Sequence, residues 1–317
     1  MHRLFPRLMA LSSVSALVPV LVPAALSIAT FAAAQPAPPL LVSPAWVAER
    51  LTAPDVVILH VGSEVGYRAG HLPGARLALA SQFSETASDA RGNPLALQMP
   101  GAEALRAGLA ALGISDGSTV VVYAQAPQSM NMATRLMVTL QYAGLENRSV
   151  LLQGGLPAWT AAGQATTTTP GPTTSGTLGP LTLQPVVVDG DWIEARLSTP
   201  GIRIVDARTP DFYSGARTGG GAENPHKTGH ITGAVNIPFS STWDADGFKS
   251  LDELRRVFSE AGVRTGEIVV TYCHIGQQAT ATLFAARLLG YDVRLYDGSF
   301  EDWSRRPELP VTNPSKK

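Results

Sequence analysis

Apolar and β-branched residues gather in short runs along this chain, and several of these runs are followed by apolar residues at helical spacing. Residues 268–272 read Ile-Val-Val-Thr-Tyr, which predicts a buried strand. The next apolar positions, Leu283, Ala286 and Leu288, predict a helix that begins near residue 279. Strands that alternate with helices are typical of a mostly parallel sheet with helices on both faces, so the pattern predicts an α/β fold.

The same order of elements occurs twice. One copy begins at Val56 with VVILHVGSEVGYRAGHLPGA. The other begins at Ile202 with IRIVDARTPDFYSG and continues, after an insert, with KTGHITGA. Further along, VLLQGGLPAW ends in Trp159 and VRLYDGSFEDW ends in Trp303. A self-match of this length, with the order kept, indicates two copies of one α/β unit.

A stretch without charge separates the two copies. Residues 166–184 are rich in Thr, Gly and Pro, a composition that is typical of an exposed linker. We therefore expect a first domain at residues 38–165 and a second domain at residues 185–312.

The N-terminus has the composition of an export signal. A basic start is followed by residues 8–33, which carry no charge, and residues 32–34 are all alanine, as at a signal-peptide cleavage site. Pro19 and Pro23 interrupt the apolar stretch, which disfavours a retained membrane anchor. We expect a signal peptide at residues 1–34 and a mature protein that is periplasmic or secreted.

Composition narrows the class of protein further. The chain is 45% hydrophobic and 15% charged, with a formal net charge of −1 and no runs of like charge. Neither a nucleic-acid partner nor, after signal cleavage, a membrane surface is expected for such a balance.

Cys273 is the only cysteine among the 317 residues, so it cannot form an internal disulfide. It follows the predicted strand and precedes the predicted helix, where loop N–H groups and the helix N-terminus favour an anion and would make a thiol nucleophilic. The alternative is that the cysteine is an inert core residue. In an oxidising compartment an unpaired cysteine is either buried out of reach or kept for its reactivity.

Four segments together carry a family resemblance. They are VDAR at residues 205–208, GHITGAVNIPF at residues 229–239, the loop that begins at Cys273, and YDGSFEDW at residues 296–303. In order and spacing they resemble the tandem rhodanese sulfurtransferases of the thiosulfate or 3-mercaptopyruvate type. The resemblance implies two rhodanese-like domains. Because residues 124–128 offer no nucleophile, the first domain is expected to be non-catalytic.

The resemblance implies a sulfurtransferase that uses no metal and no organic cofactor. Cys273 would take the outer sulfur of a small anionic donor as a persulfide, and a thiophile such as cyanide or a thiol would then remove it. Export from the cytosol favours thiosulfate as the donor. Two alternatives stay open, a 3-mercaptopyruvate sulfurtransferase and a persulfide carrier or redox module that serves a protein partner.

The expected site consists of the cysteine loop and one cation. Arg208 ends the first predicted strand of the second domain, and the resemblance places an arginine beside the loop to bind the donor anion. The alternative is that Arg208 lies at the surface and forms an ion pair with Asp206 or Asp211. The remaining expected substrate-binding residues follow the nucleophile directly: His274, Ile275, Gly276, Gln277 and Gln278.

Two other kinds of site are disfavoured. Related folds that hydrolyse phosphate esters carry a phosphate-binding arginine about six positions after the cysteine, where this chain has Ala279. His71 and His230 occupy equivalent positions in the two GHxxGA segments, which predicts the same structural role in each copy rather than a shared metal site.

Overall fold

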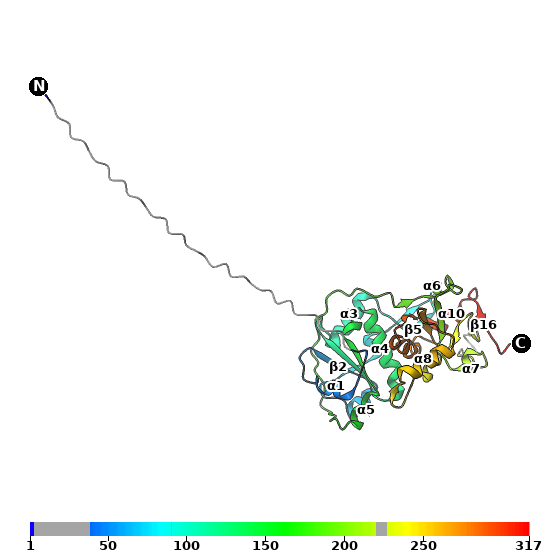
Figure 1. The fold of residues 1–317 in the computed structure, drawn as a ribbon, viewed down its shortest axis with the longest axis horizontal. Coiled ribbons are helices and arrows are strands. Elements are labelled where there is room, and N and C mark those ends of the chain that lie inside the picture. The colour runs from blue at the N-terminus through cyan, green and yellow to red at the C-terminus, as the bar shows by residue number, and fades with distance from the viewer. Residues whose placement is uncertain (3–38, 90, 220–226, 317) are drawn as a thin grey trace. The chain divides into compact units, whose positions relative to one another are not determined.

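The computed structural model describes residues 1–2, 39–89, 91–219 and 227–316 (Figure 1). Nearly all of the predicted signal peptide, residues 1–34, lies outside the described residues. Residues 37–317 form one compact unit. Within the described residues no helix is long and apolar enough to cross a membrane.

The first half of this unit contains a parallel five-stranded sheet in the order β1-β7-β6-β2-β3. The central strand β6 is flanked by β2 and β7, so its C-terminal end lies in the middle of the sheet. The strands are β1 (Leu41–Val42), β2 (Val56–Val61), β3 (Arg76–Ala78), β6 (Thr119–Ala124) and β7 (Ser149–Leu152). The helices are α1 (Pro44–Ala48), α2 (Glu64–Ala69), α3 (Ala102–Ala111), α4 (Met130–Tyr142) and α5 (Gly155–Ala161).

The second half repeats this plan in the order β11-β9-β14-β15-β8, again with parallel pairing. Its central strand is β14. The strands are β8 (Val187–Val188), β9 (Ile202–Asp206), β11 (Val235–Asn236), β14 (Ile268–Tyr272) and β15 (Asp292–Tyr296). The helices are α6 (Gly190–Glu194), α7 (Pro210–Tyr213), α8 (Leu251–Glu260), α9 (Ala279–Leu288) and α10 (Ser299–Arg305). The strand and helix expected around Cys273 are both confirmed.

Short pairings complete the fold. Three two-stranded antiparallel sheets join β4 (Glu85–Ser88) to β5 (Pro94–Gln98), β12 (Trp243–Asp244) to β13 (Gly247–Phe248), and β10 (His230–Ile231) to β16 (Val311–Thr312). Short 3-10 helices are η1 (Ala80–Gln82), η2 (Pro127–Ser129), η3 (Glu146–Arg148) and η4 (Phe239–Ser241).

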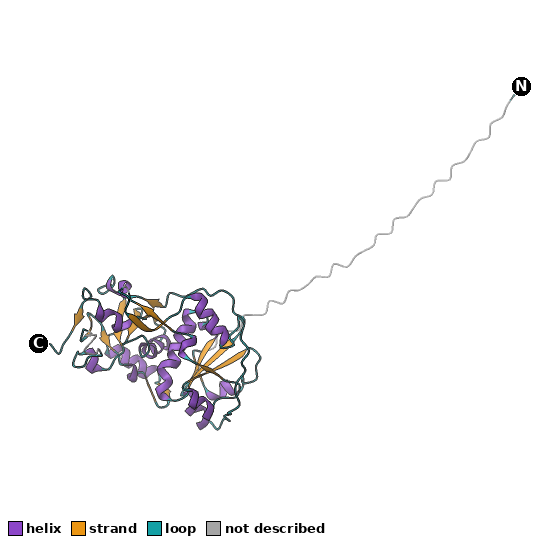
Figure 2. Cartoon of the chain, turned by 180° about the vertical axis from the view of Figure 1, so that it is seen from behind, coloured by secondary structure: helices purple, strands orange, loops and turns teal. Residues whose placement is uncertain are grey.

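Each sheet has helices on both faces (Figure 2). Successive strand residues point to opposite faces, so Val122 packs with α3 and α4 while Tyr123 packs with α1 and α5. In the second sheet Val269 packs with α8 and α9, and Val270 packs with α6 and α10. The core on the α4 and α9 side is continuous between the two sheets, because these two helices pack against each other. The α/β fold with two repeated modules is therefore confirmed.

The two modules are equivalent down to individual hydrogen bonds. His60 Nδ1 bonds to the Tyr123 hydroxyl at 2.7 Å in the first module, and the Tyr272 hydroxyl donates to Asp206 at 2.8 Å in the second. Because Tyr123 and Tyr272 occupy the same position, Ala124 is the counterpart of Cys273.

The two histidines of the repeated GHxxGA segments have the same partners in each module. His71 stacks on Tyr67 and bonds through Nδ1 to the Tyr67 carbonyl at 2.7 Å. His230 does the same with Tyr213, at 2.8 Å. Each ring therefore fastens a turn to the preceding helix.

The segment between the modules lies along the first module. The Gly171 N–H donates to the Tyr67 hydroxyl at 2.9 Å, and the Gly176 N–H donates to the Ala110 carbonyl at 2.8 Å. Leu178 is only 5% exposed. Residues 166–184, expected to be an exposed linker, contain no helix or strand and are mostly exposed, but these hydrogen bonds hold the segment against the first module.

Candidate active site

Cys273 immediately follows the central strand of the second sheet and is fully buried. Its backbone is held on both sides: its N–H donates to the Ser299 hydroxyl at 3.2 Å, and its carbonyl accepts from the Phe300 N–H at 3.0 Å. Both partners belong to α10, which is separated from β15 by Asp297 and Gly298 only. The sulfur atom is thus fixed at the carboxyl edge of the sheet, where sites of α/β proteins assemble.

The loop after the cysteine presents a row of backbone donors. In the part of the chain that the structure describes, no acceptor bonds to the N–H groups of residues 275–279; the first bonded amide of the next helix is that of Thr280, which donates to the Gln277 carbonyl. These groups lead into the ten-residue helix α9, whose dipole adds to their partial positive charge. Such an arrangement suits an anion at the loop.

Gly276 is required by the shape of this loop. Its φ angle is +74°, in the left-handed region that side chains disfavour. A Cβ atom there would also lie 2.7 Å from the Asp297 carbonyl and 3.2 Å from the Arg135 guanidinium. Positive φ and the close approach of another backbone segment therefore both favour glycine at this position.

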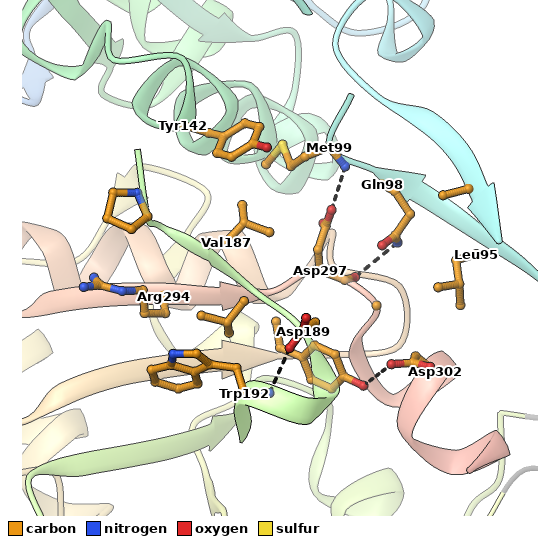
Figure 3. A pocket seen from close by; sticks show the side chains of 15 residues that line it. Leu95, Gln98, Met99, Tyr142, Val187, Asp189, Trp192, Arg294, Asp297 and Asp302 are labelled. Atoms are coloured by element: carbon orange, nitrogen blue, oxygen red, sulfur yellow. Dashed lines mark hydrogen bonds between the residues drawn. The ribbon is translucent and has the colours of Figure 1, made fainter. Parts of the chain in front are cut away.

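An ion pair between the modules holds the same loop from outside. Arg135 of α4 is fully buried, and its Nη1 donates to Asp297 Oδ1 at 2.5 Å and to the Gly276 carbonyl at 3.1 Å. Its Nη2 donates to the Leu97 carbonyl. Asp297 also accepts from the Met99 N–H at 2.6 Å through Oδ2 (Figure 3). The first module therefore contacts the cysteine loop through Arg135, and it contacts Asp297 through the end of β5 as well.

Sequence reasoning missed Arg135 and Asp297 as site residues. One signal was present: Arg135 is the only charge in the apolar helical run MNMATRLMVTL, and a lone charge on such a helix needs a buried partner. The partner lies 162 residues further along the chain, so local spacing could not identify it.

Arg208 pairs with Asp206, as in the alternative prediction, but the pair is buried and not at the surface. Its Nε and Nη2 donate to the Asp206 carboxylate, Nη2 also donates to the Gly229 carbonyl at 2.7 Å, and the guanidinium lies 4.0 Å over the Phe300 ring. Burial, and then the charge of Asp206, raise the pKa of Tyr272 well above its usual value, so its hydroxyl stays protonated and donates to that carboxylate. A donor-binding role for Arg208 stays a prediction.

A cavity of ≈ 150 Å³ adjoins the cysteine loop. The lining residues are Gly219, His274, Ile275, Phe300 and Glu301. The His274 ring packs edge-on against Phe212 at 4.5 Å, which places α7 beside the loop. Of the expected substrate-binding residues, His274 and Ile275 therefore line the cavity, whereas Gln277 and Gln278 lie at the start of α9 and are half-buried.

A larger cavity, of ≈ 630 Å³, has Asp297 in its wall (Figure 3). It is lined by Leu95, Met99 and Tyr142 of the first module and by Trp192, Arg294 and Asp302 of the second. The Tyr296 hydroxyl donates to Asp302 at 2.6 Å. All three carboxylates at its wall, on Asp189, Asp297 and Asp302, already accept hydrogen bonds from the protein.

The chain is similar to several known proteins. A family model described as a rhodanese-like domain matches residues 43–162 and again residues 189–306. The thiosulfate sulfurtransferase of Pseudomonas aeruginosa is 31% identical over 278 residues, which cover 86% of this chain and 97% of that protein. The probable 3-mercaptopyruvate sulfurtransferase of the same organism is also 31% identical, over 84% of this chain and 95% of that protein.

Two more distant similarities extend this picture. A sulfur carrier protein of Thermus thermophilus is 29% identical over 86% of this chain and 96% of its own length. The crystal structure of an anaerobic ergothioneine biosynthesis enzyme from Chlorobium limicola superimposes with a TM-score of 0.74 at 23% identity, over 86% of this chain and 70% of that one, and so shares the fold. With both modules matched and relatives aligned over nearly their whole length, the chain belongs to the rhodanese-like family and carries two rhodanese-like domains in tandem.

Proposed function

We propose that this protein is a sulfurtransferase that moves a sulfane sulfur from thiosulfate to a thiophilic acceptor, such as cyanide or a thiol, through a persulfide on Cys273. The observation that carries the proposal is the position of the only cysteine, at the carboxyl end of β14 and ahead of a row of backbone N–H groups that have no acceptor among the described residues. The relatives named as sulfurtransferases support the reaction class.

The reaction has two steps in which Cys273 ends as it began. The thiolate attacks the outer sulfur of thiosulfate, the sulfur–sulfur bond of the donor breaks, and sulfite leaves with the bonding electron pair. The acceptor, for example cyanide, then attacks the outer sulfur of the persulfide, and the thiolate is released again as thiocyanate departs. Thiolate and persulfide are both anionic, so the N–H groups of residues 275–279 stabilise the cysteine throughout.

The sulfur donor in this proposal is a small anion that the cysteine loop binds. The loop carries neutral or weakly basic side chains, and the charge of Arg208 is compensated by Asp206. We infer that the loop N–H groups contribute more than any side chain to holding the donor anion. The relative named as a probable 3-mercaptopyruvate sulfurtransferase supports that donor as the second candidate.

Steady-state transfer to cyanide tests this proposal and separates the candidates. Thiocyanate formation from thiosulfate is expected for the wild type and is expected to be lost in Cys273→Ser, because a hydroxyl of similar size is far less nucleophilic than a thiolate. Faster turnover with 3-mercaptopyruvate would select that donor. A protein that loads sulfur once and does not turn over would instead behave as a carrier, the role for which the Thermus thermophilus relative is named.

A further inference from the structure

We propose that the buried Arg135–Asp297 pair, with one partner from each module, is the positioning element of the Cys273 loop, so that the non-catalytic module sets the geometry of sulfur transfer. This inference rests on the proposed function for its reaction and adds to it a task for the first module.

The contacts connect Arg135 to the loop backbone itself. Its Nη1 donates to the Gly276 carbonyl at 3.1 Å, and the same atom donates to Asp297 at 2.5 Å. A peptide unit is planar and trans, so a carbonyl fixed toward Arg135 directs the N–H of Gln277, in the same plane, to the opposite side. Fixing one carbonyl therefore fixes one of the donors available to an anion at the loop.

The backbone around this pair adopts conformations that cost energy. Only two non-glycine residues in the described part of the chain have positive φ angles, Leu97 at +55° and Ser299 at +53°. The Leu97 carbonyl accepts from Arg135, and the Ser299 hydroxyl accepts from the N–H of Cys273. Such conformations persist where surrounding contacts hold them and gather at functional sites.

Arg135 also leaves a donor without a partner. Its Nε atom is buried and has no hydrogen-bond acceptor among the described residues. A fold that needed Arg135 only for stability would lose little by replacing the ion pair with apolar side chains of similar volume. An ion pair with an unsatisfied donor is a poor device for stability, and this fits a positioning task for Arg135.

The first module supplies an internal comparison. The position equivalent to Asp297 is Gln153, which exchanges two hydrogen bonds with the Phe248 backbone, at 2.7 and 3.1 Å. The position equivalent to Arg135 is Phe284, whose ring lies 5.0 Å from that of Phe248. Two equivalent contacts thus join the modules. The contact beside Ala124 is made by neutral and aromatic side chains, and the contact beside Cys273 is made by an ion pair.

The test measures sulfur loading in a single turnover for Arg135→Met and Arg135→Met/Asp297→Asn. The double variant removes both charges, so no buried carboxylate is left uncompensated, and Asn can still accept from Met99. The matched control is Arg203→Met, because Arg203 pairs with Glu267 near the amino end of β9, at the edge of the sheet opposite Cys273. Thermal unfolding shows which variants stay folded.

We expect both Arg135 variants to load sulfur at saturating thiosulfate about 10- to 100-fold more slowly than the wild type, with a much smaller change in the half-saturating concentration, because a misplaced loop weakens the transition state more than donor binding. Arg203→Met should load at nearly the wild-type rate. Arg135→Lys should recover part of the loss, since it keeps the charge but not the planar fork. Loading rates in the Arg135 variants equal to that of Arg203→Met would overturn the proposal.

Alkylation of Cys273 by iodoacetamide keeps this inference separate from the proposed function. Misplaced loop N–H groups stabilise the thiolate less, so alkylation at fixed pH should slow in Arg135→Met and not in Arg203→Met. If the wild type takes no sulfur from thiosulfate or 3-mercaptopyruvate, the proposed function fails while the alkylation rates still decide the role of Arg135. Equal alkylation rates in all variants would count against the positioning role even if sulfur transfer is confirmed.

Discussion

Arg208 and Arg135 are both buried arginines near Cys273, and each is paired with one carboxylate. Arg208 pairs with Asp206 of its own strand end, two residues earlier in the chain. Arg135 pairs across the modules with Asp297 and extends the contact to the cysteine loop. The sequence motif VDAR pointed to the first of these arginines, but the structure places the second one in direct contact with the loop backbone.

Replacing Arg208 should reveal how much of its role is structural. Arg208→Met leaves Asp206 buried without its guanidinium, and the free energy of unfolding should fall by about 3–5 kcal/mol. Denaturant unfolding measures this loss. A selective slowing of thiosulfate loading, with removal of the sulfur by cyanide unchanged, would in addition place the guanidinium at the donor. Unchanged stability would contradict the buried pair as described.

His60 should make stability depend on pH. Burial lowers the pKa of His60 to about 4, whereas the unfolded chain has an ordinary histidine, so protons bind the unfolded state first as the pH falls. The stability that depends on neutral His60 is fully present above pH 6.5, the pKa of an unfolded histidine, and is lost as the pH falls toward about 4. The loss in free energy of unfolding is about 2 kcal/mol between pH 7 and pH 5. Urea unfolding of the wild type and of His60→Gln at a series of pH values measures this contribution as the difference between their free energies of unfolding. Identical pH dependence in the two proteins would refute it.

At the scale of elements, the loop that follows β14 and the loop that follows β6 have the same length but differ in their residues and hydrogen bonds. Six residues run from Cys273 to the start of α9, and six run from Ala124 to the start of α4. The first-module loop contains Pro127, which has no N–H, and begins the short helix η2. Its Gln125 side chain accepts from the Ser63 N–H at 2.7 Å and fills the space beside the turn.

A cysteine alone should therefore not create a site in the first module. The variant Ala124→Cys combined with Cys273→Ser places a thiol at the equivalent strand end. The loop beside it has fewer free N–H groups, and the Gln125 side chain fills the space next to it. Mass spectrometry after exposure to thiosulfate should show no added sulfur on this variant. Loading at position 124 would show that the strand end, rather than the loop, creates the reactivity.

At the scale of the whole molecule, the sequence predicts the repeat and the cysteine loop but not the contacts between the two modules. The two modules, the strand before Cys273, the helix after it and the glycine at position 276 all follow from local patterns of apolar residues and of residues with special backbone freedom. The junction that holds the loop does not, because Arg135 and Asp297 meet only where the two modules pack against each other. The docking of residues 166–184 could not be predicted, because the segment is held mostly through its own backbone N–H and C=O groups, which every residue carries whatever its side chain.

Export is a proposal at this scale as well. We propose that residues 1–34 are removed on secretion and that the mature protein begins at or within a few residues of Gln35, outside the cytoplasm. Expression in a bacterial host, cell fractionation and N-terminal sequencing of the exported protein test this directly. Recovery of the protein with an intact Met1 in the membrane fraction would show a retained anchor instead.

The persulfide on Cys273 is the central claim, and intact-mass and peptide mass spectrometry test it most directly. After incubation with thiosulfate and removal of the excess, the wild-type protein should gain the mass of one sulfur atom, located on the peptide that contains Cys273, and cyanide should remove it. The Cys273→Ser protein should gain none. No added sulfur on the wild type, or the same addition on the serine variant, would contradict the account.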